Sequence, residues 1–354
     1  MTGILPTGAQ NDICDVSGVL VGHATLVSGA AGPLEPGRGP VRTGVTAILP
    51  HGGNLFMEKV PAGLFVLNGF GKSTGLAQLQ ELGTLETPIL LTNTLSAFRA
   101  ADAMVSVMVE QNPAIGVTTG TVNPVVGECN DGYLNDIQGR HVGEAHVRAA
   151  LAAAVGGQVQ QGAVGAGTGT MCFGFKGGIG SASRAAGGYV VGALVQANFG
   201  RRGDLMVAGV PVGQRLMEYP GEEGPEPEDV PPGSIMVVLA TDAPLDARQL
   251  GRLCKRGALG LARTGASAGN GSGDFVLGFS TAYRVEHRAG ESVTRVSLLR
   301  DDSAELDRLF LGAVEAVEEA VLSALFASRT VEGRDGHVGY ALPVNKILSW
   351  VLRG

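Results

Sequence analysis

The chain alternates short runs of β-branched and apolar residues with longer stretches whose apolar positions recur at helical spacing. The short runs predict strands at Thr43–Leu49, Gly63–Leu67, Pro88–Leu91, Gly188–Val195, Ile235–Thr241, Phe275–Ser280 and Val293–Leu298. The longer stretches predict helices at Ala97–Glu110, Val142–Val155, Leu245–Ala262 and Ser303–Phe326. We expect Asp242 to cap the helix that begins at Leu245. Strands and helices in comparable amounts predict a layered α/β or α+β domain.

The segment Met217–Gly233 is acidic and rich in proline, which predicts a solvated loop. It resembles a linker between domains, but predicted strands lie close to it on both sides. We therefore expect residues 1–354 to form a single domain.

Composition excludes several classes of protein. Of 354 residues, 44% are apolar, which is enough for a large core, and the formal charge of −7 comes without a basic cluster, which argues against nucleic-acid binding. No apolar run approaches the ~18 residues of a membrane span, and Met1–Ser17 lacks the pattern of a signal peptide. We expect a cytoplasmic protein that binds neither nucleic acid nor membranes.

Several motifs resemble functional sites only in part. The four cysteines are scattered without a CxxC pair, so no metal site is expected. Leu67–Thr74 ends like a phosphate-binding loop, but Val66 occupies the position that requires glycine. The GAGTGT stretch Gly165–Thr170 predicts either a tight turn or backbone N–H groups that bind a ligand. None of the six histidines lies in a metal-binding or hydrolase motif, so a serine nucleophile would need another base.

A small, polar turn that leads into a strand is the strongest chemical signal. In Arg263–Ser280 (RTGASAGNGSGDFVLGFS), Ser272 lies between two glycines. Glycine permits the strained peptide in which a hydroxyl attacks the preceding carbonyl. Cleavage after Gly271 would leave Ser272 with a free α-amine of pKa near 7.7–8.0, a suitable general base. The alternative interpretation is an ordinary Gly/Ser turn.

The chain resembles the DmpA/BapA family of self-processing aminopeptidases along nearly its whole length. The resemblance is carried by Asn11–His23, Thr43–Gly53, Asn123–Ile137, Gly162–Thr170, Val191–Gly200, the RTGASAGNGSGD segment, the EEA helix and Tyr340–Pro343. It implies a four-layer αββα sandwich and cleavage of the Gly271–Ser272 bond into fragments 1–271 and 272–354. It also implies a homo-oligomer of these α–β heterodimers, similar to a tetramer. The implied activity releases N-terminal amino acids from small peptides, amides or esters without a metal or cofactor.

The family resemblance also suggests roles for individual residues. Ser272 matches the nucleophile, and Tyr133 and Asn198 match donors to the substrate carbonyl or its oxyanion. A core tyrosine and a turn asparagine are the alternatives for the last two.

The expected carboxylates are less specific. Glu319 is the expected orienting carboxylate, although Val317 stands where the family commonly has a hydroxyl residue. Glu305 is the alternative, but Ser303 before it fits a helix cap better. Glu128, and after it Asp131, is expected to bind the substrate ammonium; a turn-stabilising role is the alternative for both.

Two other functions remain open from the sequence alone. One is an amide or lactam-oligomer hydrolase of the same fold, and the other is a glycine-rich binding protein that never cleaves. The preference among α-, β- and D-amino-acid substrates is not determined by the sequence.

Overall fold

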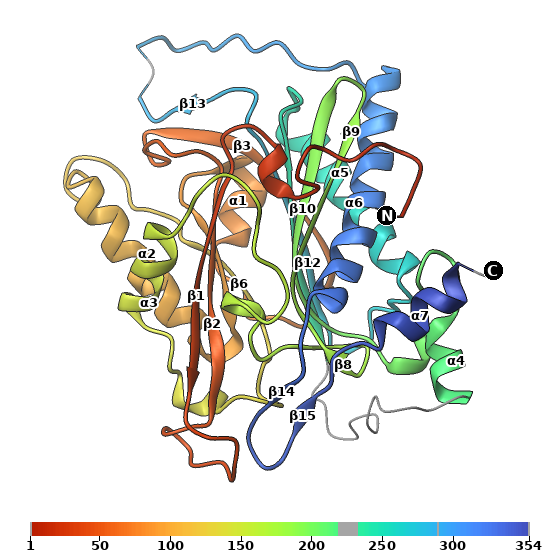
Figure 1. Ribbon diagram of the computed structural model, residues 1–354. Coiled ribbons are helices and arrows are strands. Elements are labelled where there is room, and N and C mark those ends of the chain that lie inside the picture. Colours follow the sequence, from red (N-terminus) through yellow and green to blue (C-terminus); the bar gives the residue numbers. More distant parts are fainter. Residues whose placement is uncertain (1, 219–232, 289, 353–354) are drawn as a thin grey trace.

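Two β-sheets face each other at the centre of the computed structural model, and helices cover the outer face of each sheet (Figure 1). The structure describes residues 2–218, 233–288 and 290–352. The αββα order of layers that was predicted is confirmed.

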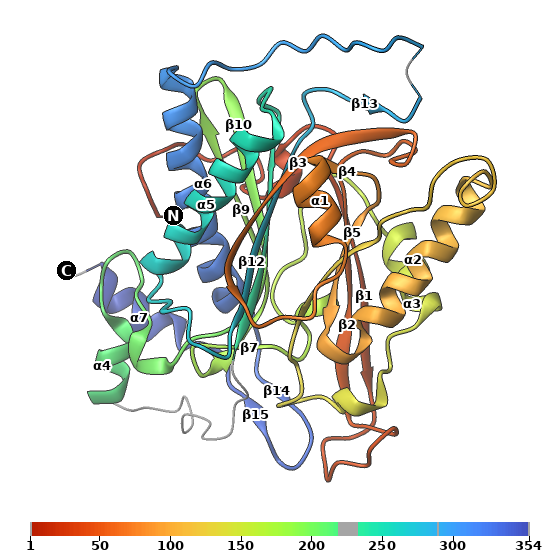
Figure 2. The same cartoon turned by 180° about the vertical axis from the view of Figure 1, so that it is seen from behind.

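The first sheet has the strand order β1-β2-β5-β6. Only the β5–β6 pair of this sheet is parallel. Its outer face is covered by two helices, which are seen from the other side in Figure 2. The elements of these two layers are β1 (Leu20–Ser28), β2 (Val41–Leu49), β5 (Ile89–Asn93), β6 (Val125–Cys129), α2 (Ala97–Gln111) and α3 (Glu144–Ala152).

The second sheet has the order β13-β3-β12-β11-β10-β9, with the short β4 paired to β3. Its outer face is covered by α5 and α6, which pack against each other (Figure 1). The pair β11–β12 is parallel, and the other pairs are antiparallel. The elements are β3 (Glu58–Gly69), β4 (Thr84–Leu85), β9 (Gly178–Ala186), β10 (Tyr189–Asn198), β11 (Ser234–Thr241), β12 (Gly273–Ser280), β13 (Val285–Glu286), α5 (Ala247–Arg263) and α6 (Ala304–Phe326).

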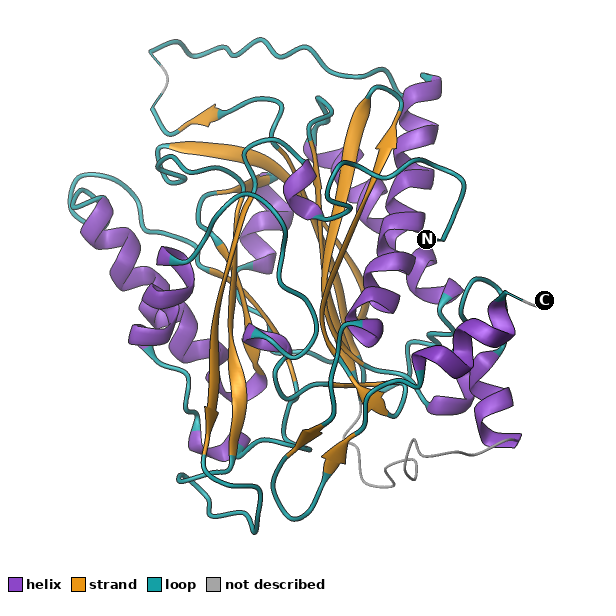
Figure 3. Ribbon diagram, in the orientation of Figure 1, coloured by secondary structure: helices purple, strands orange, loops and turns teal. Residues whose placement is uncertain are grey.

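Shorter elements lie at the ends of the layers (Figure 3). They are α1 (Leu76–Leu82), β7 (Met171–Cys172), β8 (Phe175–Lys176), α4 (Val212–Glu218), β14 (Val331–Glu332), β15 (Val338–Gly339) and α7 (Val344–Val351). The pairs β7–β8 and β14–β15 form separate two-stranded ribbons.

Each interface between layers has its own apolar core. The core between the sheets joins Ile48 and Leu91 of the first sheet to Met236 and Leu277 of the second. The other two cores lie between each sheet and its helices. Glycine lets these layers approach closely: a Cβ at Gly180 of β9 would collide with a carbonyl oxygen of α6. Among the helices of the described residues, none combines the length and apolarity needed to cross a bilayer.

The structure corrects two predictions about local structure. Val293–Leu298 forms no strand: it is extended but exposed and pairs with no neighbour in the described chain, so its alternating pattern has no sheet to join. The cap of α5 is Asp246, which accepts from Gln249 N at 2.7 Å, whereas Asp242 accepts from Val190 N. The predicted loop Met217–Gly233 lies largely outside the described residues.

Candidate active site

Ser272 lies at the junction between the turn that follows α5 and the first residue of β12. Its backbone N–H donates to Gly269 O at 2.8 Å, and Asn68 Nδ2 donates to the same oxygen at 2.7 Å. Ala268 in this turn has a φ of 48°, in the left-handed region that non-glycine residues rarely adopt. The turn is therefore held in one conformation although it is short and rich in small residues.

Asp274 is the direct partner of the Ser272 hydroxyl. Ser272 Oγ donates to Asp274 Oδ1 at 2.6 Å, and the two residues are 7% and 3% exposed. Burial raises the pKa of the Asp274 carboxyl, although hydrogen bonds from Ser272 and from the backbone at Ile235 oppose the rise. Asp274 was not among the predicted site residues. The signal was available, because residues two apart in an extended chain project to the same side.

A cavity of about 700 Å³ opens beside Ser272. It is lined by the turn before β12, by the first residues of β11 and by the end of β10 with the loop that follows it. Three charged side chains contribute to its wall: Asp274, Arg201 and Asp204, of which the last two are exposed.

Asn198, the last residue of β10, also lines this cavity. Its side-chain Oδ1 accepts from Met171 N at 2.8 Å, which fixes the plane of the amide. Its Nδ2 is buried and has no hydrogen-bond partner within the described residues. Buried donors are normally paired, so an unpaired amide donor in a residue of the cavity wall is unusual and marks Asn198 as a candidate functional residue.

Tyr133 lies in the turn after β6 and is not among the residues that line the cavity. Its ring stacks on that of His337, with centroids 4.3 Å apart and an interplanar angle of 1°. His337 Nδ1 also lies 2.8 Å from Tyr133 O. This double contact joins the predicted 1–271 fragment to the predicted 272–354 fragment.

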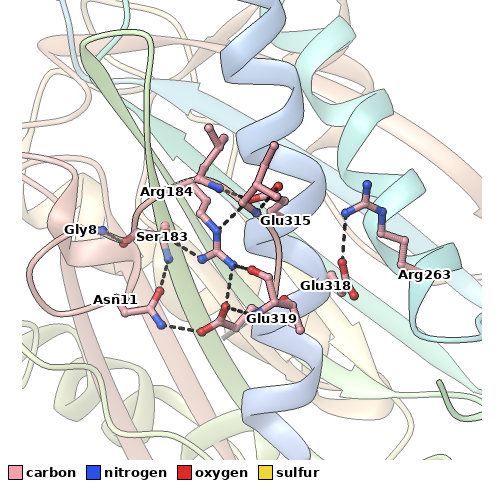
Figure 4. Close-up of polar contacts among 11 residues, drawn as sticks. Gly8, Asn11, Ser183, Arg184, Arg263, Glu315, Glu318 and Glu319 are labelled. Carbon is pink, nitrogen blue, oxygen red and sulfur yellow. Dashed lines mark hydrogen bonds and ion pairs between the residues drawn. The ribbon is translucent and has the colours of Figure 1, made fainter. Parts of the chain in front are cut away.

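The carboxylate of Glu319, the expected orienting residue, is bound by Arg184 and by the N-terminal segment. Its carboxylate accepts from Arg184 Nη2 at 2.6 Å, from Thr2 N at 3.0 Å and from Asn11 Nδ2 at 2.7 Å (Figure 4). Burial by itself raises the pKa of Glu319, but these hydrogen bonds together keep it below its usual value. Within the described residues, the hydrogen bonds of the Glu319 carboxylate go to Arg184 and the N-terminal segment, and none joins it to Ser272.

The alternative carboxylate, Glu305, lies in the first turn of α6. Ser303 caps this helix by accepting from Leu306 N at 3.3 Å, as the interpretation of a capping serine requires. Glu305 does not line the cavity.

The two acids expected to bind the substrate ammonium are both buried and absent from the cavity wall. Glu128 accepts from Lys72 N at 2.7 Å and from the Thr94 hydroxyl. Asp131 has no exposed surface and accepts from Asn135 Nδ2 at 2.9 Å; burial raises its pKa to about 7. The acids in the cavity wall are Asp204 and Asp274. No sequence signal pointed to Asp204, because the loop that contains it has no recognisable pattern.

Comparisons with known proteins identify the family of this chain. The model of peptidase family S58 matches residues 11–339. The beta-peptidyl aminopeptidases BapA of Sphingosinicella microcystinivorans and S. xenopeptidilytica are 44% and 40% identical to this chain. The two alignments cover 95% and 96% of this chain and 86% of each relative.

Solved structures are similar over the full length. The PH0078 protein of Pyrococcus horikoshii OT3 superposes with a TM-score of 0.93 at 54% identity, covering 100% of this chain and 97% of that one. The L-aminopeptidase D-Ala-esterase/amidase of Ochrobactrum anthropi has a TM-score of 0.89 at 40% identity, and the match covers 100% of this chain and 96% of that one. It is described as a prototype of the serine aminopeptidases with a variant of the Ntn-hydrolase fold. A beta-aminopeptidase of Burkholderia sp. has a TM-score of 0.90 at 42% identity, with the same coverage. The chain therefore belongs to peptidase family S58 and is a hydrolase with this variant of the Ntn fold.

Proposed function

We propose that this protein is a self-processing serine aminopeptidase that cuts its own Gly271–Ser272 bond and then releases N-terminal residues from short peptides, amides or esters. The observation that carries the proposal is the contact of Ser272 Oγ with Asp274 Oδ1 at the wall of a cavity. The aminopeptidases among its relatives support the same activity.

Asp274 supplies the base for self-cleavage, when no free α-amine exists. It accepts the Ser272 hydroxyl proton while Oγ bonds to the carbonyl carbon of Gly271. The C–N bond then breaks, the proton passes to the Ser272 nitrogen, and water hydrolyses the resulting ester. A burial-raised pKa suits this role, because it makes the carboxylate a stronger base.

After cleavage, the α-amine of Ser272 becomes the general base for substrate turnover. Asn198 Nδ2 donates to the oxyanion that forms on the substrate carbonyl, a contribution of roughly 3–4 kcal/mol to the barrier. Tyr133 is proposed as the second donor, from the turn beside β6. Ser272 and Asn198 share the cavity wall, which supports this pairing.

Asp204 is proposed as the carboxylate that recognises the substrate ammonium, in place of Glu128 and Asp131. It is an exposed acid of the cavity wall, whereas the carboxylates of the other two are buried and already accept hydrogen bonds from the protein. Glu319 is proposed to hold the N-terminal segment rather than to orient Ser272.

The test of self-processing compares the wild-type chain with Ser272→Ala by intact mass and N-terminal sequencing. We expect the wild type to give a fragment that begins Ser-Gly-Asp, and the variant to remain a single chain of 36.1 kDa. Cleavage of the variant at the same bond would show that Ser272 is not the nucleophile.

The test of aminopeptidase activity uses pairs of short amides that differ only in a free or acetylated N-terminus. We expect turnover of the free amines alone. Equal turnover of the blocked substrates would favour an amide hydrolase of the same fold. The panel includes α-, β- and D-amino-acid amides, because the cavity wall does not decide among them.

The assembly of cleaved protomers into a tetramer-like homo-oligomer, and the cytoplasmic location, stay predictions. Light scattering after size-exclusion chromatography measures the first, and fractionation of the source cells measures the second.

A further inference from the structure

Lys176 of β8 has a fully buried ammonium group that is surrounded by backbone. Its Nζ donates to Gly167 O at 2.9 Å, to Thr170 O at 2.8 Å and to Gly177 O at 2.7 Å. These three acceptors use all three donors of a lysine ammonium. The side chain therefore ties the GAGTGT stretch to the β7–β8 ribbon.

The segment that Lys176 holds is the one that orients Asn198. Met171 follows Thr170 directly, and its N–H donates to Asn198 Oδ1. Since an amide is planar, fixing Oδ1 also fixes the direction of the unpartnered Nδ2. A displacement of Thr170 and Met171 would turn this donor away from the cavity.

The GAGTGT stretch that Lys176 holds also contacts the turn of Asp131, whose carboxylate is fully buried. Asp131 O accepts from Leu134 N and Asn135 N and so closes the turn that carries Tyr133. Gly169 of the GAGTGT stretch packs against this turn, because a Cβ at Gly169 would lie 3.0 Å from Asp131 Cβ.

We propose that Lys176 is a positioning residue for the oxyanion site, which fixes Asn198 through Thr170 and Met171. The inference rests on the proposed function of Asn198. Burial of an ammonium costs desolvation energy, and apolar side chains of similar volume often stabilise a fold equally well. Packing alone therefore does not explain a lysine at this position. Burial lowers the pKa of Lys176 to about 7, in agreement with that cost.

The experiment is a double-mutant cycle with Lys176→Met and Asn198→Ala in the full-length protein. Turnover of one short free-amine amide is measured per cleaved protomer, counted by intact mass of the fragment that begins at Ser272. We expect each single variant to lower kcat by about 10²–10³-fold while KM changes less than about threefold. The double variant should lose little more than either single variant, because both remove the same donor.

Losses that multiply in the double variant, or an unchanged kcat in Lys176→Met, would overturn the inference. If Lys176→Met does not fold, the cycle is run with Lys176→Gln. Where both variants fold, Lys176→Gln should retain more kcat than Lys176→Met, because its side chain keeps an N–H donor. An equal loss in the two would point to a merely structural role.

Lys59→Met is the matched control. Lys59 forms an ion pair with Glu86 at 2.9 Å and lies at the opposite end of β3 from Gly69, the residue that pairs with Gly273. We expect this variant to keep the kcat of the wild type. A wild type that cleaves itself but does not turn over amides would contradict the proposed function, and with it the oxyanion role on which the inference rests, whereas an active wild type with an unchanged kcat in Lys176→Met would contradict the inference alone.

Discussion

At the scale of single residues, the proposed base Asp274 would make self-cleavage independent of histidine, because its carboxylate accepts from the Ser272 hydroxyl. Replacement of Asp274 by Asn keeps the shape and a hydrogen-bond acceptor but removes the base. We expect the self-cleavage rate of Asp274→Asn to fall by about 10²–10⁴-fold, measured as loss of the full-length band with time after synthesis. Asp102→Asn, on the exposed side of α2, is the control and should cleave normally. Cleavage of Asp274→Asn at the wild-type rate would remove Asp274 from the mechanism.

The pKa of Asp274 also predicts how self-cleavage depends on pH. Burial raises this pKa above the ordinary 3.8, and only the ionised carboxylate accepts a proton, so cleavage should be slow below the raised pKa and accelerate as the pH rises through it. Turnover by the mature enzyme instead requires a neutral α-amine, whose pKa is near 7.7–8.0, so its rate should rise at higher pH. Rates of both reactions, measured from about pH 4 to pH 9, should give two separate profiles. A single shared midpoint would indicate one common base.

The candidate site residues differ in how local their sequence signals are. Ser272 has its own glycine-flanked turn, and Asn198 ends a clear strand, so both can be located from the chain alone. Glu128 and Asp131 are acids in a turn-like motif, which suggests exposure, but the fold buries both. No local pattern shows that the ammonium of Lys176 will be surrounded by the carbonyl groups of Gly167, Thr170 and Gly177.

At the scale of elements, strong periodicity predicted the structure well where each pattern also had a packing partner. The strands β2 and β10–β12 and the helices α2, α5 and α6 lie close to their predicted ranges. Val293–Leu298 has an equally good strand pattern but no neighbour, so pattern alone was insufficient. The short β7–β8 ribbon gave too little pattern to be predicted, although it supports Asn198.

The turn between α5 and β12 provides a prediction at this scale. Ala268 adopts a left-handed conformation that costs a non-glycine residue about 1–2 kcal/mol. Ala268→Gly relieves this strain but makes the unfolded chain more flexible. In the uncut Ser272→Ala background, we therefore expect the free energy of unfolding to rise by roughly 0.5–1 kcal/mol, measured by urea denaturation.

The same substitution in a helix gives the opposite expectation and serves as its control. Ala262 is exposed within α5, where Ala→Gly should lower the free energy of unfolding by about 0.5–1 kcal/mol. Equal destabilisation at both positions would show that the conformation of Ala268 is not strained.

At the scale of the whole molecule, the proposed cleavage divides one continuous fold between two fragments. Fragment 272–354 supplies β12, which lies between β3 and β11 of the other fragment, and it supplies α6, which covers β9 and β10. The fragments can separate only if the second sheet is opened. Cleavage should therefore create a new N-terminus without releasing either piece.

A buried charge cluster adds to this attachment. Arg184 of β9 has no exposed surface and binds Glu315 and Glu319 of α6 at 3.1 and 2.6 Å (Figure 4). Glu315 in turn accepts from the N–H groups of Ile4 and Leu5, so α6 also holds the N-terminal segment. Arg184 is thus the cation that compensates two buried carboxylates across the two fragments.

Arg184→Met tests this attachment in the uncut Ser272→Ala background, where both fragments remain one chain. Removal of one partner leaves the carboxylates buried without compensation, so we expect the free energy of unfolding to fall by about 3–5 kcal/mol. Arg263→Met is the matched control, because Arg263 also pairs with a glutamate of α6, Glu318 at 3.2 Å, but its side chain is 45% exposed. Glu318 is only 7% exposed, so this variant also leaves a buried carboxylate without its cation, but the Arg263 side chain reaches solvent, and we expect a loss smaller than that of Arg184→Met. Urea denaturation of the two variants measures both losses in the free energy of unfolding. Equal losses would show that the buried Arg184 cluster is no more stabilising than the Arg263 pair. Strand pairing in the second sheet would then be the main attachment between the fragments.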